Sequence, residues 1–372
     1  MTLELRNVTK VMQGRAVVDN VSLTVQDGEF FVLLGTSGSG KSTILRLIAG
    51  LEKPDSGQIY LDGKEITNLP SRERNLGMVF QDYGLYPNMN VYQNIAYGLE
   101  ARGLKKHDVA GRVRAAAAKL QIDHHLERSI TELSGGEQQR VALARSLAKD
   151  ASAYLYDEPL SNLDPKLRFS ARHDIQAVHR SKQRPSLYVT HDQTEAFALA
   201  DRIGVLSAGR LQQIGTVDTL MRYPVNTFVA SFLGTMPINL VTGELRREND
   251  RYRVHIGGSS VVLTSAWTAM LDAYGKRMVT VGIRPSALFM PRPAETDPLL
   301  AGTLETVEDM LGESIVVVKL EGQSRVSALL TDVDIMAFEV GRPFTLGVDV
   351  DELLLFDIDT SAALSVSHAP VF

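Results

Sequence analysis

Short apolar runs alternate with helical patterns along the first two thirds of the chain. The uninterrupted runs are FFVLL at 30–34, LGMVF at 76–80, AYLY at 153–156 and SLYVT at 186–190. Such runs are typical of strands buried on both faces, and their alternation with helices predicts a mainly parallel sheet flanked by helices. Between about 82 and 150 the pattern is helical throughout, which predicts an inserted helical subdomain.

The pattern changes after about residue 235. Short alternating segments at 252–256, 279–283, 314–320 and 344–348 are separated by Gly, Pro and Asp. They predict one or two small β-barrels. The sequence therefore predicts an α/β domain over residues 1–235 and an all-β domain over residues 236–372.

Composition is compatible with two domains and excludes several classes of function. The chain has 372 residues, 44% of them hydrophobic, and a net charge of -5, which offers no general attraction to nucleic acid or anionic lipid. The absence of cysteine excludes disulfides and thiolate chemistry. The sequence contains neither a signal-peptide pattern nor an apolar run near the roughly 20 residues that span a bilayer. We therefore expect a soluble or peripheral protein.

A phosphate-binding pattern follows the first apolar run. Residues 35–42, GTSGSGKS, match G-x-x-x-x-G-K-[ST] between a predicted strand and a predicted helix. In such a loop, backbone N–H groups surround phosphate oxygens, Lys41 reaches the β- and γ-phosphates and Ser42 holds Mg²⁺. A Gly/Ser-rich surface turn is the alternative, but the strand and helix on either side favour nucleotide binding.

Polar groups follow three further predicted strands. Asp157 and Glu158 come after AYLY, His191 after SLYVT and Gln81 after LGMVF. Parallel sheets bind ligands at this edge, so Asp157 could hold a metal ion and Glu158 could polarise a water molecule. Each has a simpler alternative: a solvated turn for the carboxylates, and for His191 a position beside a helix capped by Asp192.

A second glycine-rich helix start lies at 133–137, LSGGE. Ser134 and Glu137 have the spacing of a capping box, which by itself accounts for the helix start. Capping does not account for Gly135 and Gly136, which cost backbone entropy but permit close approach of a ligand. With free N–H groups and the helix dipole, this segment is a second candidate phosphate site.

These motifs together resemble the ATP-binding-cassette family over residues 1 to about 235. The phosphate-binding loop, Gln81, LSGGE, Asp157-Glu158, the SNLD segment ending in Asp164, and His191 occur in the family's order. The resemblance implies a P-loop NTPase fold with ATP and Mg²⁺ as ligands. The nucleotide-binding residues that it implies are Met12, Gly35, Thr36, Ser37, Gly38, Ser39, Gly40, Lys41, Ser42, Thr43, Gln81, Ser134, Gly135, Gly136, Glu137 and Asp157.

The resemblance also implies roles and a dimer. Glu158 is expected to be the general base and His191 the γ-phosphate sensor, with Lys41 assisting catalysis. The metal ligands would be Ser42, Gln81 and Asp157. The LSGG segment would contact ATP bound by a second ATPase subunit, in the simplest case a homodimer. Asp164 would lie at the dimer interface, although an Asp before Pro165 is also an ordinary helix start.

Two positions depart from the family's common pattern. Glu137 stands where many members have Gln, which puts the ribose contact of that residue in doubt. Met12 stands where members usually place an aromatic ring on adenine. A thioether packs on a purine more weakly and less selectively, so we expect a weaker preference for ATP over GTP.

Residues 81–99 and 157–168 resemble the ATPases of carbohydrate importers. In that branch the first segment receives a helix of a membrane permease, and Tyr83, Leu85 and Tyr86 are candidates for this contact; packing in the core is the alternative. The segments 232–241, 281–288 and 346–357 resemble the regulatory domain of the maltose and glycerol-phosphate importer ATPases, which is built from small OB-like barrels.

The resemblance thus implies an ATPase that drives uptake of a sugar or glycerol-phosphate solute. Its partners would be two transmembrane permease subunits and, indirectly, an extracytoplasmic solute-binding protein, with no nucleic acid involved. It would lie on the cytoplasmic face of the inner membrane as a peripheral subunit. Alternatives are an importer for another solute, such as a polyamine, or a soluble cassette ATPase acting on ribosomes or DNA.

Overall fold

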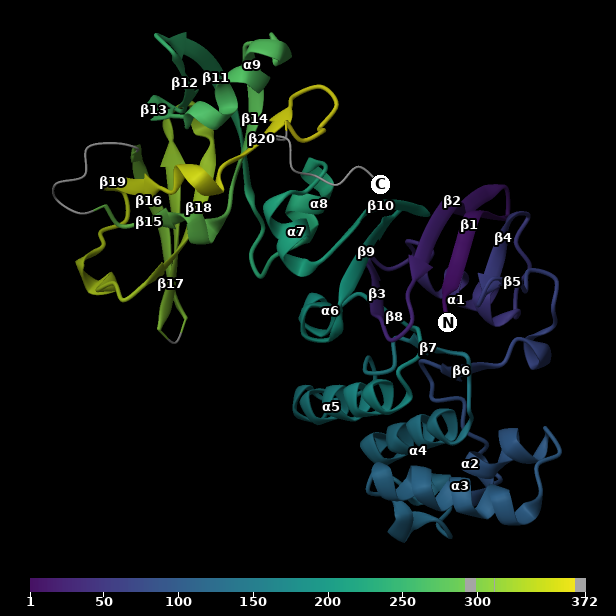
Figure 1. The fold of residues 1–372 in the computed structure, drawn as a ribbon. Helices are drawn as coiled ribbons and strands as arrows, with labels where there is room; N and C mark the ends of the chain where they lie inside the picture. The colour runs from purple at the N-terminus through teal and green to yellow at the C-terminus, as the bar shows by residue number, and fades with distance from the viewer. Residues whose placement is uncertain (292–298, 311, 365–372) are drawn as a thin grey trace. The chain divides into compact units, whose positions relative to one another are not determined.

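The computed structural model describes residues 1–291, 299–310 and 312–364 (Figure 1). The chain forms two compact units, Met1–Val217 and Asp218–Phe372. This division comes earlier than the predicted domain boundary at 235. The segment between the two positions forms two short helices, α7 (Val217–Arg222) and α8 (Thr227–Phe232), whose buried residues Leu220, Val229 and Ala230 all lie in the second unit.

Two sheets form the framework of the first unit. A mainly parallel sheet has the strand order β10-β9-β3-β8-β7-β6, in which only the β9–β10 pair is antiparallel. An antiparallel sheet has the order β2-β1-β4-β5. The strands are β1 (Leu3–Met12), β2 (Arg15–Val25), β3 (Phe30–Gly35), β4 (Ser56–Leu61), β5 (Lys64–Glu65), β6 (Leu76–Val79), β7 (Ala153–Asp157), β8 (Ser186–Thr190), β9 (Arg202–Ser207) and β10 (Arg210–Gly215).

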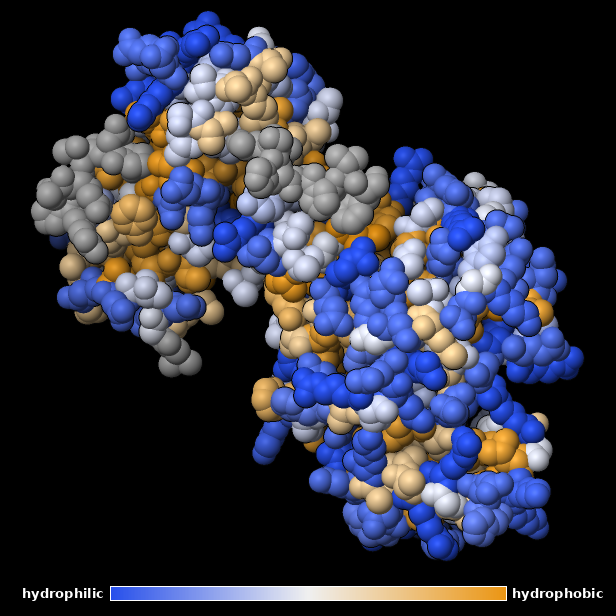
Figure 2. Space-filling view, viewed as in Figure 1, coloured by the Kyte–Doolittle hydropathy of each residue, from blue (hydrophilic) through white to orange (hydrophobic). Residues whose placement is uncertain are grey.

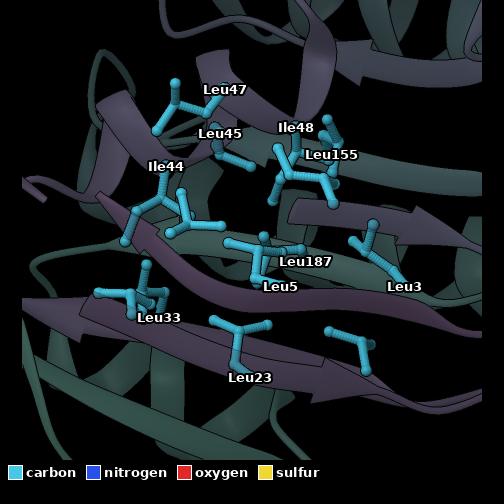
Figure 3. Close-up of a cluster of buried hydrophobic side chains, with 14 of the residues drawn as sticks. Leu3, Leu5, Leu23, Leu33, Ile44, Leu45, Leu47, Ile48, Leu155 and Leu187 are labelled. Atoms are coloured by element: carbon cyan, nitrogen blue, oxygen red, sulfur yellow. The ribbon is translucent and has the colours of Figure 1, made fainter. Parts of the chain in front are cut away.

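The core of the first unit lies between these sheets, around helix α1 (Lys41–Ala49). Figure 3 shows Ile44, Leu45, Leu47 and Ile48 of α1 among leucines of the antiparallel sheet and of β3, β7 and β8. The helix is buried along most of its surface because apolar side chains meet it from both sheets. This packing fixes the start of α1, and with it the loop that precedes it.

The predicted helical subdomain is present. Helices α2 (Val91–Glu100), α3 (Lys106–Lys119) and α4 (Gly135–Ala148) lie together (Figure 1). Asn90 caps α2 in a capping box with Gln93, and the buried Asn94 binds backbone carbonyls of the preceding loop. Two further helices, α5 (Pro165–Lys182) and α6 (Gln193–Leu199), follow β7 and β8.

The second unit is built from antiparallel strands, as predicted for an OB-like regulatory domain. Its described residues form two sheets, β13-β12-β11-β14-β20 and β15-β19-β16-β17-β18, whose buried side chains share one core. The strands are β11 (Asn239–Glu248), β12 (Arg251–Ile256), β13 (Ser259–Val262), β14 (Met278–Ile283), β15 (Leu288–Phe289), β16 (Leu299–Met310), β17 (Glu313–Leu320), β18 (Arg325–Thr331), β19 (Pro343–Val348) and β20 (Leu354–Asp357), with helix α9 (Thr268–Tyr274).

Hydrophilic residues cover most of the visible surface of the first unit, whereas the second unit shows both hydrophilic and hydrophobic areas (Figure 2). Among the described residues, no helix combines the length and the apolar character needed to cross a membrane.

Candidate functional site

The loop between β3 and α1 has a shape that requires glycine. Gly40 has φ 105°, and a Cβ there would lie 2.3 Å from the carbonyl oxygen of Val17. A Cβ at Gly35 would lie 2.4 Å from the carbonyl oxygen of Leu206. No side chain caps α1 at Gly40, so the N–H groups of its first turn are free to bind an anion.

Other residues of the predicted loop divide into an open side and a buried side. Thr36, Ser37 and Gly38 are exposed, whereas Ser39 is buried and its hydroxyl has no hydrogen-bond partner in the described structure. Thr43 is half-buried in the first turn of α1. The exposed side therefore offers backbone N–H groups to a ligand on a rigid support.

Lys41 is buried at the base of this loop, with 4% of its side chain exposed. Its Nζ donates to the carbonyl oxygens of Gly35 at 2.9 Å and Thr36 at 3.0 Å, and lies 3.8 Å from Glu158 Oε1. Burial lowers the pKa of Lys41, and the charges of Glu158 and Asp157 oppose that effect. The lysine thus holds the loop together and carries positive charge to its base.

Ser42 and Asp157 bring two hard oxygen ligands together. The Ser42 hydroxyl donates to Asp157 Oδ1 at 2.8 Å, at the carboxyl end of β7. Burial raises the pKa of Asp157, and the bond from Ser42 partly offsets this rise. Mg²⁺ is usually held by one or two protein oxygens plus phosphate and water. This pair fits that requirement beside a phosphate-binding loop.

Glu158 follows in a left-handed backbone conformation, with φ 42°. Its N–H donates to the carbonyl oxygen of Val189 at 3.0 Å, which anchors it to β8. Its Oε2 lies 2.9 Å from Nδ1 of His191, whose ring is about half exposed. Asp192 caps α6, as its spacing indicated, and so fixes the backbone beside this histidine. The structure therefore joins Glu158, His191 and Lys41 in one cluster.

The segment after Glu158 connects the cluster to Gln81. The Ser161 hydroxyl donates to the carbonyl oxygen of Glu158, and Asn162 Nδ2 donates to the carbonyl oxygen of Gln81, both at 2.9 Å. The Gln81 side chain is exposed just beyond β6. Asp164 caps α5 by accepting from Lys166 and Leu167 N–H groups, with proline in the first turn.

Arg168 is a residue of this site that sequence reasoning did not single out. Its guanidinium donates to the carbonyl oxygens of Leu163 and Ser161 and lies 3.7 Å from Asp192 Oδ2. It thereby ties the segment after Glu158 to the residue that follows His191. Two of its three partners are backbone oxygens, which leave no pattern in the sequence.

The LSGGE segment forms the predicted capping box. Ser134 caps α4, and the Glu137 carboxylate accepts a hydrogen bond from the Ser134 N–H. Gly135 and Gly136 have ordinary helical backbone, and added Cβ atoms would lie 3.4 Å or more from their nearest neighbours, the side chains of Leu163 and Leu167. The contacts within one chain therefore do not by themselves account for glycine at these two positions.

Met12 ends β1 and is half-buried. The chain turns at once into β2, whose Val17 carbonyl lies against the position where Gly40 would carry a Cβ. Met12 therefore lies at the turn between β1 and β2, and this strand pair borders the phosphate-binding loop. This is a suitable place for a base-packing side chain.

The three residues predicted to contact a permease differ in exposure. Tyr83 is only 7% exposed, and its left-handed backbone is held by Arg145, which donates to the carbonyl oxygens of Tyr83 and Gly84. Leu85 is half-buried. Tyr86 is 40% exposed and its ring lies 4.7 Å from that of the exposed Tyr97. Tyr86 thus offers the larger surface to a partner.

Comparison with known proteins agrees with the motif order. Residues 18–161 match the family model described as ABC transporter. The sn-glycerol-3-phosphate import ATP-binding protein UgpC of Escherichia coli O6:K15:H31 (strain 536 / UPEC) is 41% identical over 366 residues, covering 96% of this chain and 98% of the relative. The same protein of Escherichia coli (strain K12) is 40% identical and that of Shigella sonnei (strain Ss046) 41%, over the same shares. The chain therefore belongs to the ATP-binding-cassette transporter family, as an ATPase of its importer branch.

Proposed function

We propose that this chain powers uptake of a glycerol-phosphate or related sugar or polyol solute. The solute class is suggested by relatives named for sn-glycerol-3-phosphate import that match nearly the whole chain. The ATP-hydrolysing role rests on one observation above all: Glu158 and His191 are hydrogen-bonded at 2.9 Å beside Lys41, Ser42 and Asp157.

This geometry suggests how the side chains divide the reaction. Lys41 exchanges its loop carbonyls for the β- and γ-phosphate oxygens, to which its charge is attracted. Ser42 and Asp157, together with Gln81 from the end of β6, would hold Mg²⁺, which would neutralise charge on the phosphates. Glu158 accepts a proton from the attacking water, and His191, the proposed γ-phosphate sensor, also keeps that carboxylate oriented.

A second copy of the chain completes the proposed site. Contacts within one chain do not by themselves account for glycine at 135 and 136, which supports contact of Ser134, Gly135 and Gly136 with ATP on another subunit. Asp164, exposed at the start of α5, would then lie at the interface. Two permease subunits in the inner membrane would bind at Leu85 and Tyr86, with a solute-binding protein acting from outside.

The test is to isolate the complex from membranes through a tag on this chain and measure ATP hydrolysis with candidate solutes. We expect integral-membrane partners, stimulation by a glycerol phosphate or sugar rather than a polyamine, and loss of turnover in Glu158→Gln by about 10²- to 10⁴-fold. The matched control is Glu65→Gln, the same change at an exposed position on β5. Recovery without a membrane partner, or substantial hydrolysis by Glu158→Gln, would contradict the proposal.

A further inference from the structure

Residues of two segments hold the carboxylate of Glu137 at both of its oxygens. Oε2 accepts from the Ser134 N–H at 2.8 Å and from the Ser134 hydroxyl at 2.6 Å. Oε1 lies 2.9 Å from Nε2 of His125. Since an ionised carboxylate only accepts hydrogen bonds, His125 must donate from Nε2. The contact with Ser134 is part of the helix cap, whereas the contact with His125 is not needed for capping.

His125 lies buried in the helical subdomain, where its position is set by the short helix that contains it. It ends the short 3₁₀ helix Asp123–His125 after α3, and only 6% of the residue is exposed. Its Nδ1 is buried and has no hydrogen-bond partner in the described part of the chain. The bond to Glu137 is therefore the polar contact that orients this ring.

This arrangement creates a difficulty for phosphate binding. The bonds from Ser134, followed by the charge and the bond of His125, lower the pKa of Glu137, so its negative charge is present at neutral pH in the first turn of α4. The same turn is the predicted phosphate site, where a negative charge repels the ligand. In addition, the Ser134 hydroxyl already donates its proton to Glu137 and must release it to donate to a phosphate.

We propose that His125 is a positioning residue for the LSGGE segment. By holding Oε1 of Glu137, it keeps the carboxylate turned away from the ligand when the Ser134 hydroxyl moves to the γ-phosphate. Without this hold, the carboxylate is free to stay on the Ser134 hydroxyl and the N–H groups of the first turn of α4, where it competes with the phosphate and weakens its binding. The inference rests on the proposed function, in which Ser134 contacts ATP held by a second copy.

A neutral side chain at 137 removes the need for His125. A glutamine there carries no charge to repel phosphate and accepts more weakly from the Ser134 hydroxyl. The effect of changing His125 should therefore depend on Glu137. This dependence distinguishes positioning of the carboxylate from simple packing of the ring.

The first experiment compares His125→Asn with His125→Gln in the full-length complex. Gln places its amide nitrogen near the position of Nε2, whereas Asn places it near Nδ1, so only Gln keeps a donor for Glu137. We expect His125→Asn to raise KM for ATP about tenfold, with kcat changed less than about twofold. His125→Gln should stay close to the unchanged protein, as should His124→Asn at the exposed neighbouring position. An unchanged KM in His125→Asn, or equal impairment in His125→Gln, would overturn the proposal.

The second experiment repeats the change in a Glu137→Gln background. Glu137→Gln alone is expected to lower KM for ATP about threefold, and adding His125→Asn should then change KM little. The same rise in KM in both backgrounds would assign His125 a packing role and refute the inference. If His125→Asn does not fold, a raised KM in Glu137→Gln alone decides against it. These outcomes concern KM only, and would leave the proposed function intact as long as the unchanged complex hydrolyses ATP and Glu158→Gln does not.

Discussion

Charged side chains around the phosphate-binding loop are buried to an extent that folding alone does not favour. Lys41 and Asp157 are 4% and 5% exposed. Burial lowers the pKa of Lys41 and raises the pKa of Asp157, and both shifts favour the neutral form of the side chain. Each effect is only partly offset, by the charges of Glu158 and Asp157 for Lys41 and by the bond from Ser42 for Asp157. The site therefore holds charge that a nucleotide and a cation can complete, at a cost to the stability of the free protein.

Asp157→Asn should separate the contribution of the buried charge to ligand binding from its cost to stability. Asparagine keeps an acceptor for the Ser42 hydroxyl but carries no charge, so we expect the nucleotide-free protein to gain about 1 kcal/mol in free energy of unfolding. Hydrolysis should fall on the order of 100-fold, because an amide is a poorer metal ligand than a carboxylate. Scanning calorimetry without nucleotide measures the first effect and an ATPase assay the second.

The gain in free energy of unfolding of Asp157→Asn over the unchanged protein should increase with pH. The folded-state pKa of Asp157 is raised above its ordinary value of 3.8, so its contribution to stability is complete below that pH and is lost as pH rises through the folded-state pKa. The advantage of Asp157→Asn should therefore be small near pH 4 and grow toward neutral pH. An advantage that shrinks over this range would show that burial is not the dominant cause.

Site residues at strand ends could be predicted from the sequence, whereas other site residues could not. Asp157, Glu158 and His191 follow uninterrupted apolar runs, and parallel pairing brings those strand ends to one sheet edge. The His125–Glu137 contact joins two segments through a turn that has no recognisable pattern. The burial of Tyr83 was likewise undecided, because apolar residues in a loop are compatible with both a surface groove and the core.

At the scale of elements, β3, the phosphate-binding loop and α1 act as one unit. Side chains of both sheets pack against α1 and fix its position relative to β3. The loop that joins β3 to α1 therefore has little conformational freedom. Its tightest point is Gly40, where the backbone is left-handed and the carbonyl of Val17 occupies the space of a side chain. Gly38 is also left-handed, with φ 77°, but has nothing within 4 Å of an added Cβ.

These two glycines give a matched comparison. Gly38→Ala should cost about 1 kcal/mol, because only the backbone conformation is strained. Gly40→Ala should cost about 3 kcal/mol, because strain is joined by a collision with β2 that the packed sheet cannot relieve. Calorimetry of the nucleotide-free protein measures both. Equal losses at the two positions would mean that the Val17 contact is unimportant.

Element prediction succeeded where periodicity was simple. The runs at 30–34, 153–156 and 186–190 coincide with β3, β7 and β8, and the alternating segments beyond 235 coincide with strands of the second unit. The antiparallel sheet β2-β1-β4-β5 was not distinguished from the parallel one. Bulges in the β1–β2 pairing interrupt its alternation, so no regular period marks which strands pair.

At the scale of the whole molecule, α7 and α8 belong with the β-rich unit. The N–H of Thr227 donates to the carbonyl oxygen of Ser361, and Ala363 donates back to Val225. Ala230 packs in a small cluster with Ile238 and Phe356. Helical periodicity in two such short segments does not reveal which domain they cover, which is why the unit division differs from the predicted boundary.

Two C-terminal fragments test this assignment. A fragment of residues 218–372 keeps α8 over its cluster, whereas a fragment of residues 236–372 loses the buried Val229, Ala230 and Leu233. We expect the shorter fragment to be less stable by about 3 kcal/mol or more. Urea unfolding followed by fluorescence of Trp267, the only tryptophan of the chain, measures the difference. Equal midpoints and slopes would assign α8 elsewhere.

The two large cores have no residue in common among the described parts of the chain. A substitution that repacks the β-rich unit therefore need not disturb the helix that supports the phosphate-binding loop. Substitutions confined to one core should therefore change the packing of that unit and leave the buried contacts of the other in place. The split between the cores thus determines which heritable changes the protein tolerates.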